Sequence, residues 1–216
     1  MQPLSVRAWS NLMDLQMVTN DYERYTETYR QITEKQNHAL LLYIKKIHFT
    51  ACHFHRDVPE ADWNSLIANL DLDDWYPNGA IGALDDMVKS ILNRSCTSLN
   101  PHQVIHLLVR LTALPGYFPY RGMFHELAAL LCVHVGDTDC ALANIEAAIA
   151  LNPNPNRYEL QLKLFIGLKQ KAAAQASLVA YERFLDDNPS LKLAYKNSLA
   201  MLADQITHLK DDPDAD

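Results

Sequence analysis

Apolar residues recur every three or four positions along most of this chain, a spacing that predicts α-helices rather than strands. Three helices are expected within residues 3–56, and further helices after that are expected at 60–70, 80–93, from Pro101, and at 121–134, 138–151, 156–168, 172–187 and 190–208. Alternating valine- or threonine-rich strands are missing, and only 6 glycines are present. The predicted fold class is therefore all-α.

The strongest break in the helical pattern is the segment Leu114–Pro119, which holds two prolines and a glycine. It predicts an irregular helical region at residues 1–116, followed by a more regular array with a cap helix at 117–210. Residues 211–216 are rich in aspartate and are expected to form an acidic disordered tail.

The array contains a recurring pattern of a turn, a helix with small residues on one face, and a closing proline. Its clearest copy begins at Gly136, continues through Ala141, Ile145 and Ala148, and ends at Pro153. A weaker copy ends at Pro189. Helix–turn–helix repeats of this length stack into α-solenoids, which serve as binding scaffolds and bring no chemistry of their own.

Residues 122–153 resemble a tetratricopeptide repeat. Small side chains occupy the expected packing positions, with Gly136 at the turn; they are Ala128, Ala129, Ala141 and Ala148. The match departs from the family at His125 and Cys132, where aromatic residues are common, and the second copy is degenerate. The resemblance implies an α-solenoid with a C-terminal cap helix and a role in protein–protein interaction.

In such an array, residues of the first helix of each pair line the concave face. The candidate partner-binding residues are therefore His125 and either Leu131 or His134 in the first pair, and Arg157, Gln161 and Lys163 in the second. Arg157 and Lys163 are expected to hold a peptide or an acidic terminus through their charges.

A second resemblance is to the soluble extramembrane domains of bacterial envelope glycosyltransferases and O-antigen ligase-type polymerases, in which irregular helices precede tetratricopeptide units. It is carried by Arg7–Ser10 and by Cys96–Leu99. It implies an extracytoplasmic domain with a Cys52–Cys96 disulfide. The residues alone leave a cytoplasmic or a periplasmic location open, and they suggest that Cys132 and Cys140 are small buried hydrophobic residues.

Composition narrows the function further. The net charge of −7 argues against a nucleic-acid-binding protein, which needs a basic surface. No apolar run is long enough to span a membrane, and no signal-peptide pattern is expected at the start. No nucleophile elbow, phosphate loop or dinucleotide fingerprint occurs, so we expect no enzyme activity and no cofactor.

Two alternatives to the scaffold remain open. The region His48–His55 is the densest group of possible metal ligands, with Cys52 four residues after His48, and predicts a ligand- or metal-binding regulatory domain. The favoured interpretation of this cluster is that the end of a helix packs against its neighbour. The stripe Tyr22, Tyr25 and Tyr29 is likewise expected to pack against another helix. The other alternative is a self-associating structural module that forms a homodimer.

Overall fold

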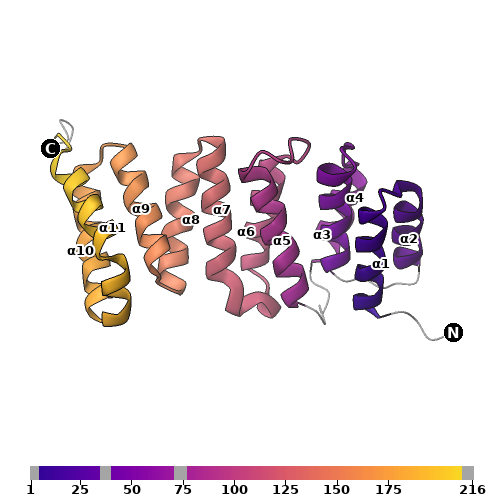
Figure 1. Ribbon diagram of the computed structural model, residues 1–216, viewed down its shortest axis with the longest axis horizontal. Coiled ribbons are helices and arrows are strands. Elements are labelled where there is room, and N and C mark those ends of the chain that lie inside the picture. Colours follow the sequence, from indigo (N-terminus) through magenta and orange to yellow (C-terminus); the bar gives the residue numbers. More distant parts are fainter. Residues whose placement is uncertain (1–4, 35–39, 71–76, 211–216) are drawn as a thin grey trace. The chain divides into compact units, whose positions relative to one another are not determined.

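The computed structural model describes residues 5–34, 40–70 and 77–210, and it confirms the all-α prediction (Figure 1). The chain divides into two compact units, an N-terminal unit of residues 1–118 and a C-terminal unit of residues 119–216. The predicted acidic tail lies outside the described residues. No helix of the described ranges has the length and hydropathy needed to cross a membrane.

The N-terminal unit is built from helices that follow one another with short connections. They are α1 (Val6–Val18), α2 (Tyr22–Glu34), α3 (Leu40–His48), α4 (Glu60–Ala68), α5 (Pro77–Leu92) and α6 (Pro101–Thr112). A π-helical turn, Phe49–His53, continues α3. π-Turns inside or after α-helices are frequent at functional sites.

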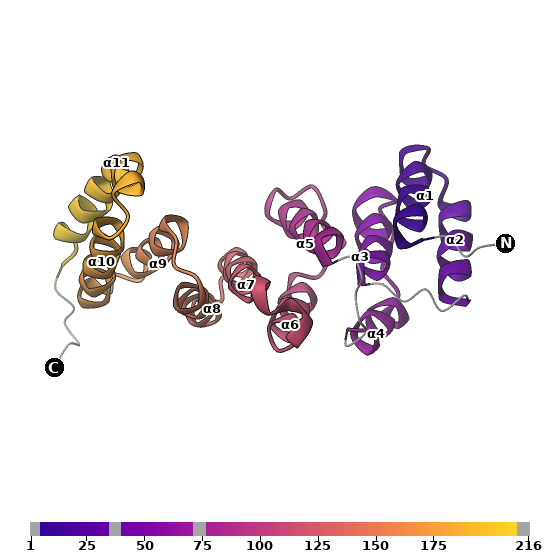
Figure 2. The ribbon, with the colours of Figure 1, turned by 90° about the horizontal axis from the view of Figure 1, so that it is seen from below.

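Helix α3 is the centre of this unit. It packs against α1, α4 and α5, and both ribbon views place it between the α1–α2 pair and α5 (Figures 1 and 2). Its sequence is apolar on nearly every side, and residues from Leu40 to Ile44 are all buried. A helix that is hydrophobic all round is stable only when neighbours cover it on several faces.

The stripe of tyrosines on α2 packs against a lysine of α3. The Lys46 ammonium lies 5.8, 5.4 and 5.2 Å from the ring centroids of Tyr22, Tyr25 and Tyr29. Lys46 is only 6% exposed, and burial lowers its pKa while the Asp62 carboxylate opposes that effect. The three ring faces stabilise a cation that would otherwise be costly to bury. The stripe is therefore a helix-packing surface, as expected.

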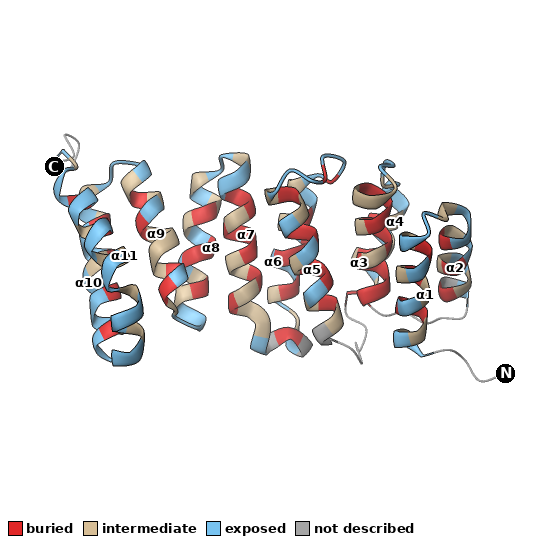
Figure 3. Ribbon diagram, in the orientation of Figure 1, coloured by how far each residue is buried: buried red, intermediate tan, exposed pale blue. Residues whose placement is uncertain are grey.

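The C-terminal unit consists of two helical hairpins and a last helix. The helices are α7 (Arg121–Val135), α8 (Thr138–Leu151), α9 (Pro155–Gly167), α10 (Lys171–Asp186) and α11 (Pro189–Thr207). Helices α7 and α8 pack together, as do α9 and α10, and α11 packs on α9 and α10. The predicted pairing of neighbouring helices is confirmed, and buried residues line the facing sides (Figure 3).

Small side chains allow the close approach of α7 and α8. Ala129, Ile145 and Ala148 form one buried cluster, which Leu160 and Leu164 of α9 extend. Local caps determine where these helices begin: the Asp137 side chain accepts from the Cys140 N–H, and Asn154 accepts from the Arg157 N–H. The helix limits could therefore be predicted to within a residue or two.

The turn between α7 and α8 depends on Gly136, whose φ of 81° lies in the left-handed region. We expect Gly136→Ala to lower the free energy of unfolding by about 1 kcal/mol, because a Cβ is strained there even though no atom lies within 4 Å of it. Urea unfolding measures the loss. The control is Gly167→Ala, at a helical glycine that also has open space; a similar loss there would contradict the explanation.

Candidate functional site

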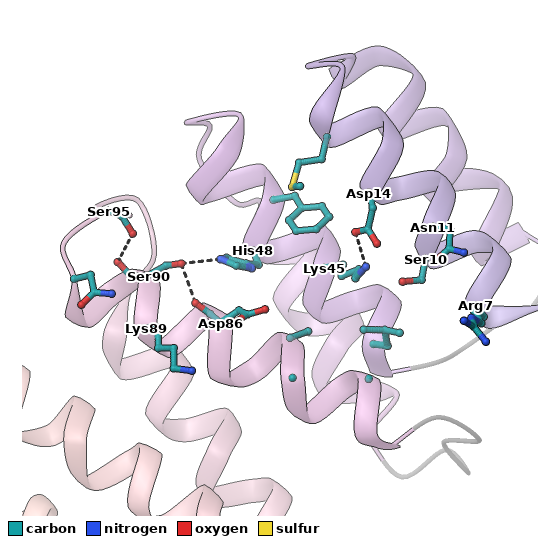
Figure 4. A pocket seen from close by; sticks show the side chains of 17 residues that line it. Arg7, Ser10, Asn11, Asp14, Lys45, His48, Asp86, Lys89, Ser90 and Ser95 are labelled. Atoms are coloured by element: carbon teal, nitrogen blue, oxygen red, sulfur yellow. Dashed lines mark hydrogen bonds and ion pairs between the residues drawn. The ribbon is translucent and has the colours of Figure 1, made fainter.

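A cavity of about 810 Å³ lies within the N-terminal unit, between α1, α3 and α5 (Figure 4). Each helix contributes side chains at helical spacing, so that one face of each lines the cavity. Helix α1 contributes Arg7, Asn11 and Asp14, and α3 contributes Lys45 and His48. The volume lies within the range of small-molecule sites.

The first half of α5 adds almost no side-chain bulk to the cavity lining, whereas Asp86, Lys89 and Ser90 line the cavity further along this helix. The small residues there are Gly79, Gly82 and Ala83, and a Cβ built on Gly82 would meet no atom within 4 Å. Glycine inside a helix costs stability relative to alanine. At these positions its effect is to leave room for another molecule to approach the helix backbone.

The middle of the cavity holds a lysine–aspartate pair. The Lys45 ammonium lies 2.5 Å from an Asp14 carboxylate oxygen and 5.6 Å from the centroid of the Phe49 ring. The Lys45 side chain is 14% exposed and that of Asp14 is 43% exposed. The pair joins α1 to α3 and neutralises both charges at this point of the lining.

One end of the cavity contains a histidine and two serines in a fixed network. His48 Nε2 lies 3.0 Å from Ser90 Oγ, and the Ser90 hydroxyl donates to the Asp86 carbonyl at 2.8 Å. The Ser95 hydroxyl donates in turn to the Ser90 carbonyl at 3.1 Å. Because the Ser90 hydrogen is already used, His48 Nε2–H is the donor to Ser90, and Ser90 is not arranged as a nucleophile with a histidine base.

Burial sets the charge of this histidine. Desolvation lowers the pKa of His48 below its ordinary value of 6.5, and the Asp86 carboxylate only partly opposes the shift. His48 is therefore neutral at pH 7. In this state Nδ1 is an acceptor, and the ring adds no positive charge to the cavity.

The lowered pKa predicts a pH dependence of stability. Below about pH 6.5 the unfolded chain protonates His48 while the folded protein does not, so the free energy of unfolding falls as the pH falls. We expect His48→Gln to show a smaller loss between pH 7 and pH 5 than the wild type in urea unfolding. The exposed His106→Gln variant is the control, and an equal pH dependence in all three proteins would refute the prediction.

A disulfide anchors the wall of the cavity that follows α5. Cys52, in the π-helical turn, and Cys96 have their sulfurs 2.15 Å apart, and they are the pair named in the sequence analysis. Ser95 and Asn93 precede Cys96 and line the cavity. The Cys96 N–H also donates to the Ser90 carbonyl at 3.1 Å. The bond thus ties the wall to the end of α3.

The disulfide also changes the interpretation of the His48–His55 region. Cys52 is bonded to Cys96 and does not present a thiolate, and His48 bonds to Ser90. Among the described residues, no three histidine, cysteine, aspartate or glutamate side chains come together in a way that would hold a metal ion. The region continues the end of α3, and its residues His48 and Phe49 form part of the cavity wall.

The second cysteine pair corrects an expectation. Cys132 and Cys140 were expected to be small buried hydrophobic residues, but the structure joins them in a disulfide with sulfurs 2.09 Å apart. Cys132 is fully buried and Cys140 is half-buried. Each lies four residues from Gly136, so the tight turn brings the two side chains face to face. This symmetry about the turn was a signal in the sequence.

The candidate residues of the C-terminal unit do not form one cluster. His125 Nδ1 lies 2.9 Å from Asn144 Oδ1, Gln161 accepts from Ser177 at 2.7 Å, and the Lys163 ammonium lies 3.6 Å from Glu159. His134 is exposed. Within the described ranges no hydrogen bond or ion pair links one candidate to another.

Arg157 requires a correction. It was expected to hold an acidic partner, but its side chain is 5% exposed and its Nε lies 2.8 Å from the Glu126 carboxylate. The guanidinium also donates to the carbonyls of Ala148 and Asn152 at the end of α8. A partner could reach it only by breaking these contacts, so Arg157 is a structural residue at the α8–α9 junction.

Similarity to other proteins does not identify the site. No protein-family model, curated protein or solved structure matches this chain. The cavity itself was missed in the sequence because its residues come from three separate helices. One signal was present: Lys45 and His48 interrupt the apolar pattern of α3.

Proposed function

We propose that this protein is a non-catalytic protein-interaction scaffold and that the cavity of the N-terminal unit is where it holds a segment of its partner. The observation that carries the proposal is the lining of the cavity. It combines preorganised hydrogen-bonding side chains with open space along Gly79, Gly82 and Ala83.

The state of the polar groups favours binding over catalysis. Lys45 is neutralised by Asp14, and the Ser90 and Ser95 hydroxyls donate to main-chain carbonyls. A nucleophile needs a base that can accept its proton, and His48 is bonded to Ser90 in the opposite sense. The Ser90 and Ser95 oxygens can nevertheless offer lone pairs to a bound molecule, and Asn11 and Asn93 offer side-chain amides.

We further propose that the scaffold is the extracytoplasmic part of a bacterial envelope glycan-assembly protein, as the second sequence resemblance implies. Its support in the structure is the pair of disulfides, Cys52–Cys96 and Cys132–Cys140. Disulfides persist in oxidising compartments such as the periplasm and are rare in the cytosol. The regular helical pairs of the C-terminal unit fit the tetratricopeptide type of scaffold.

The test is selection from a library of random heptapeptides on the oxidised protein of residues 1–216, followed by titration of the selected peptides. We expect Gly82→Leu, which fills the cavity, to weaken their binding by at least about tenfold, a loss of about 1.4 kcal/mol. The control is Gly167→Leu, at a glycine with equal open space in the C-terminal unit.

Two results would overturn the proposal. One is that no peptide binds above background. The other is that Gly82→Leu and Gly167→Leu both bind the selected peptides as tightly as the wild type, which would mean that the peptides do not bind in the cavity. Unfolding midpoints of both variants, measured in parallel, show whether a loss of binding is a loss of folding.

A further inference from the structure

The cavity of the N-terminal unit carries one unbalanced charge of each sign. Lys45 is paired with Asp14, and the Lys89 ammonium lies 2.5 Å from the Asp85 carboxylate. His48 is neutral, as argued above. Arg7 and Asp86 remain, and both are exposed residues. Neither forms an ion pair within 4 Å with another described residue, although the Asp86 carboxylate, after that of Asp85, helps to raise the pKa of Lys89.

The two unbalanced charges lie apart. Figure 4 shows Arg7 beyond Asn11 at one end, and Asp86 beside His48 and Ser90 at the other. Acceptors gather at the Asp86 end, where the hydroxyl hydrogens of Ser90 and Ser95 are used by carbonyls and the Lys89 ammonium is used by Asp85. The cavity therefore has a donor end and an acceptor end, which a ligand of a single charge would not match.

The length of the cavity follows from α5. Its lining positions run from Gly79 to Ser90, eleven steps along the helix, which correspond to about 16 Å at 1.5 Å per step. An extended chain advances about 3.3 Å per residue, so about four or five residues span this distance.

The remaining lining suits a peptide backbone. Asn11 and Asn93 line the cavity, and each side-chain amide offers a donor and an acceptor, which is what a peptide group needs in return. The glycine-lined face lets a main chain come close to α5.

We propose that the cavity binds an extended peptide of about four residues, with a carboxylate at Arg7 and an ammonium group at Asp86. This assignment rests on the proposed function. The ligand is therefore zwitterionic. Its carboxylate binds Arg7, its ammonium group binds Asp86, and both groups are needed for full affinity.

The test titrates the oxidised protein of residues 1–216 with four forms of tetra-alanine: uncapped, N-acetylated, C-amidated, and capped at both ends. We expect the uncapped form to bind most tightly. Arg7→Gln should weaken only the forms with a free carboxylate, and Asp86→Asn only those with a free ammonium group, by about fivefold each. Arg110→Gln and Asp57→Asn, exposed charges outside the cavity, are the matched controls.

The outcomes separate this assignment from the function on which it rests. Equal binding of the four forms, or equal effects of Arg7→Gln on all of them, would overturn the charge assignment. The scaffold proposal would still stand if library peptides bound in a Gly82-dependent way. If no library peptide binds, both proposals fall.

Discussion

Removing the Cys52–Cys96 disulfide is expected to lower the free energy of unfolding by about 4 kcal/mol. The bond closes a loop of 44 residues, and the chain-entropy estimate for a loop of this length gives about that value. The change is Cys52→Ser together with Cys96→Ser, and the measurement is urea unfolding under non-reducing conditions. A thiol count on the unfolded wild-type protein should find no free thiol before reduction and four afterwards.

The second disulfide is the internal control. Cys132 and Cys140 are only 8 residues apart, so the same estimate gives about 2.5 kcal/mol for the double serine variant. If both double variants lose the same stability, loop closure is not the main source of the effect. Free thiols in the unreduced wild type, or a Cys52–Cys96 variant as stable as the wild type, would contradict the first prediction outright.

The ends of the helices could be predicted because they depend on neighbouring residues. The side chain of Asn100, the residue before Pro101, accepts from the His102 N–H and caps the start of α6. Gly136 adopts the left-handed conformation and ends α7. Side chains that cap a helix are within three residues of the groups they bind. A reader of the sequence therefore sees both partners of each cap at once.

The cavity could not be predicted because its residues are far apart in the chain. Arg7, Lys45 and Ser90 are brought together only when α1 and α5 pack on α3. Polar positions at helical spacing on α1 are equally compatible with a solvated helix face. The spacing of polar residues in one helix does not indicate whether that polar face lies in solvent or faces another helix.

Arg157 shows why a charged residue is hard to place from sequence. It lies three residues after the cap Asn154, in the first turn of α9, where the helix dipole does not favour a cation. It is buried here because Gly122 leaves room: a Cβ on that residue would lie 2.9 Å from the guanidinium. The sequence contains Gly122, but only the packing of α7 near the start of α9 shows what the missing side chain makes possible.

Replacing Glu126 with alanine is expected to lower the free energy of unfolding by about 3 kcal/mol. The change leaves the buried Arg157 guanidinium without its carboxylate, and an unpaired buried charge costs several kcal/mol. The hydrogen bonds that the Arg157 guanidinium keeps to the carbonyls of Ala148 and Asn152 limit the loss of stability. Urea unfolding of the purified variant measures the effect, with the exposed Glu146→Ala as control, which should change stability by less than about 0.5 kcal/mol.

A second substitution separates the unpaired charge from lost packing. When Arg157→Met is added to Glu126→Ala, the unpaired charge is removed while most of the side-chain volume stays. The double variant should therefore lose less stability than the sum of the two single variants. Additive losses would mean that the pair contributes through packing alone. A Glu126→Ala protein as stable as the wild type would mean that Arg157 does not depend on Glu126, and the guanidinium could then turn outward to a partner, as first expected from the sequence.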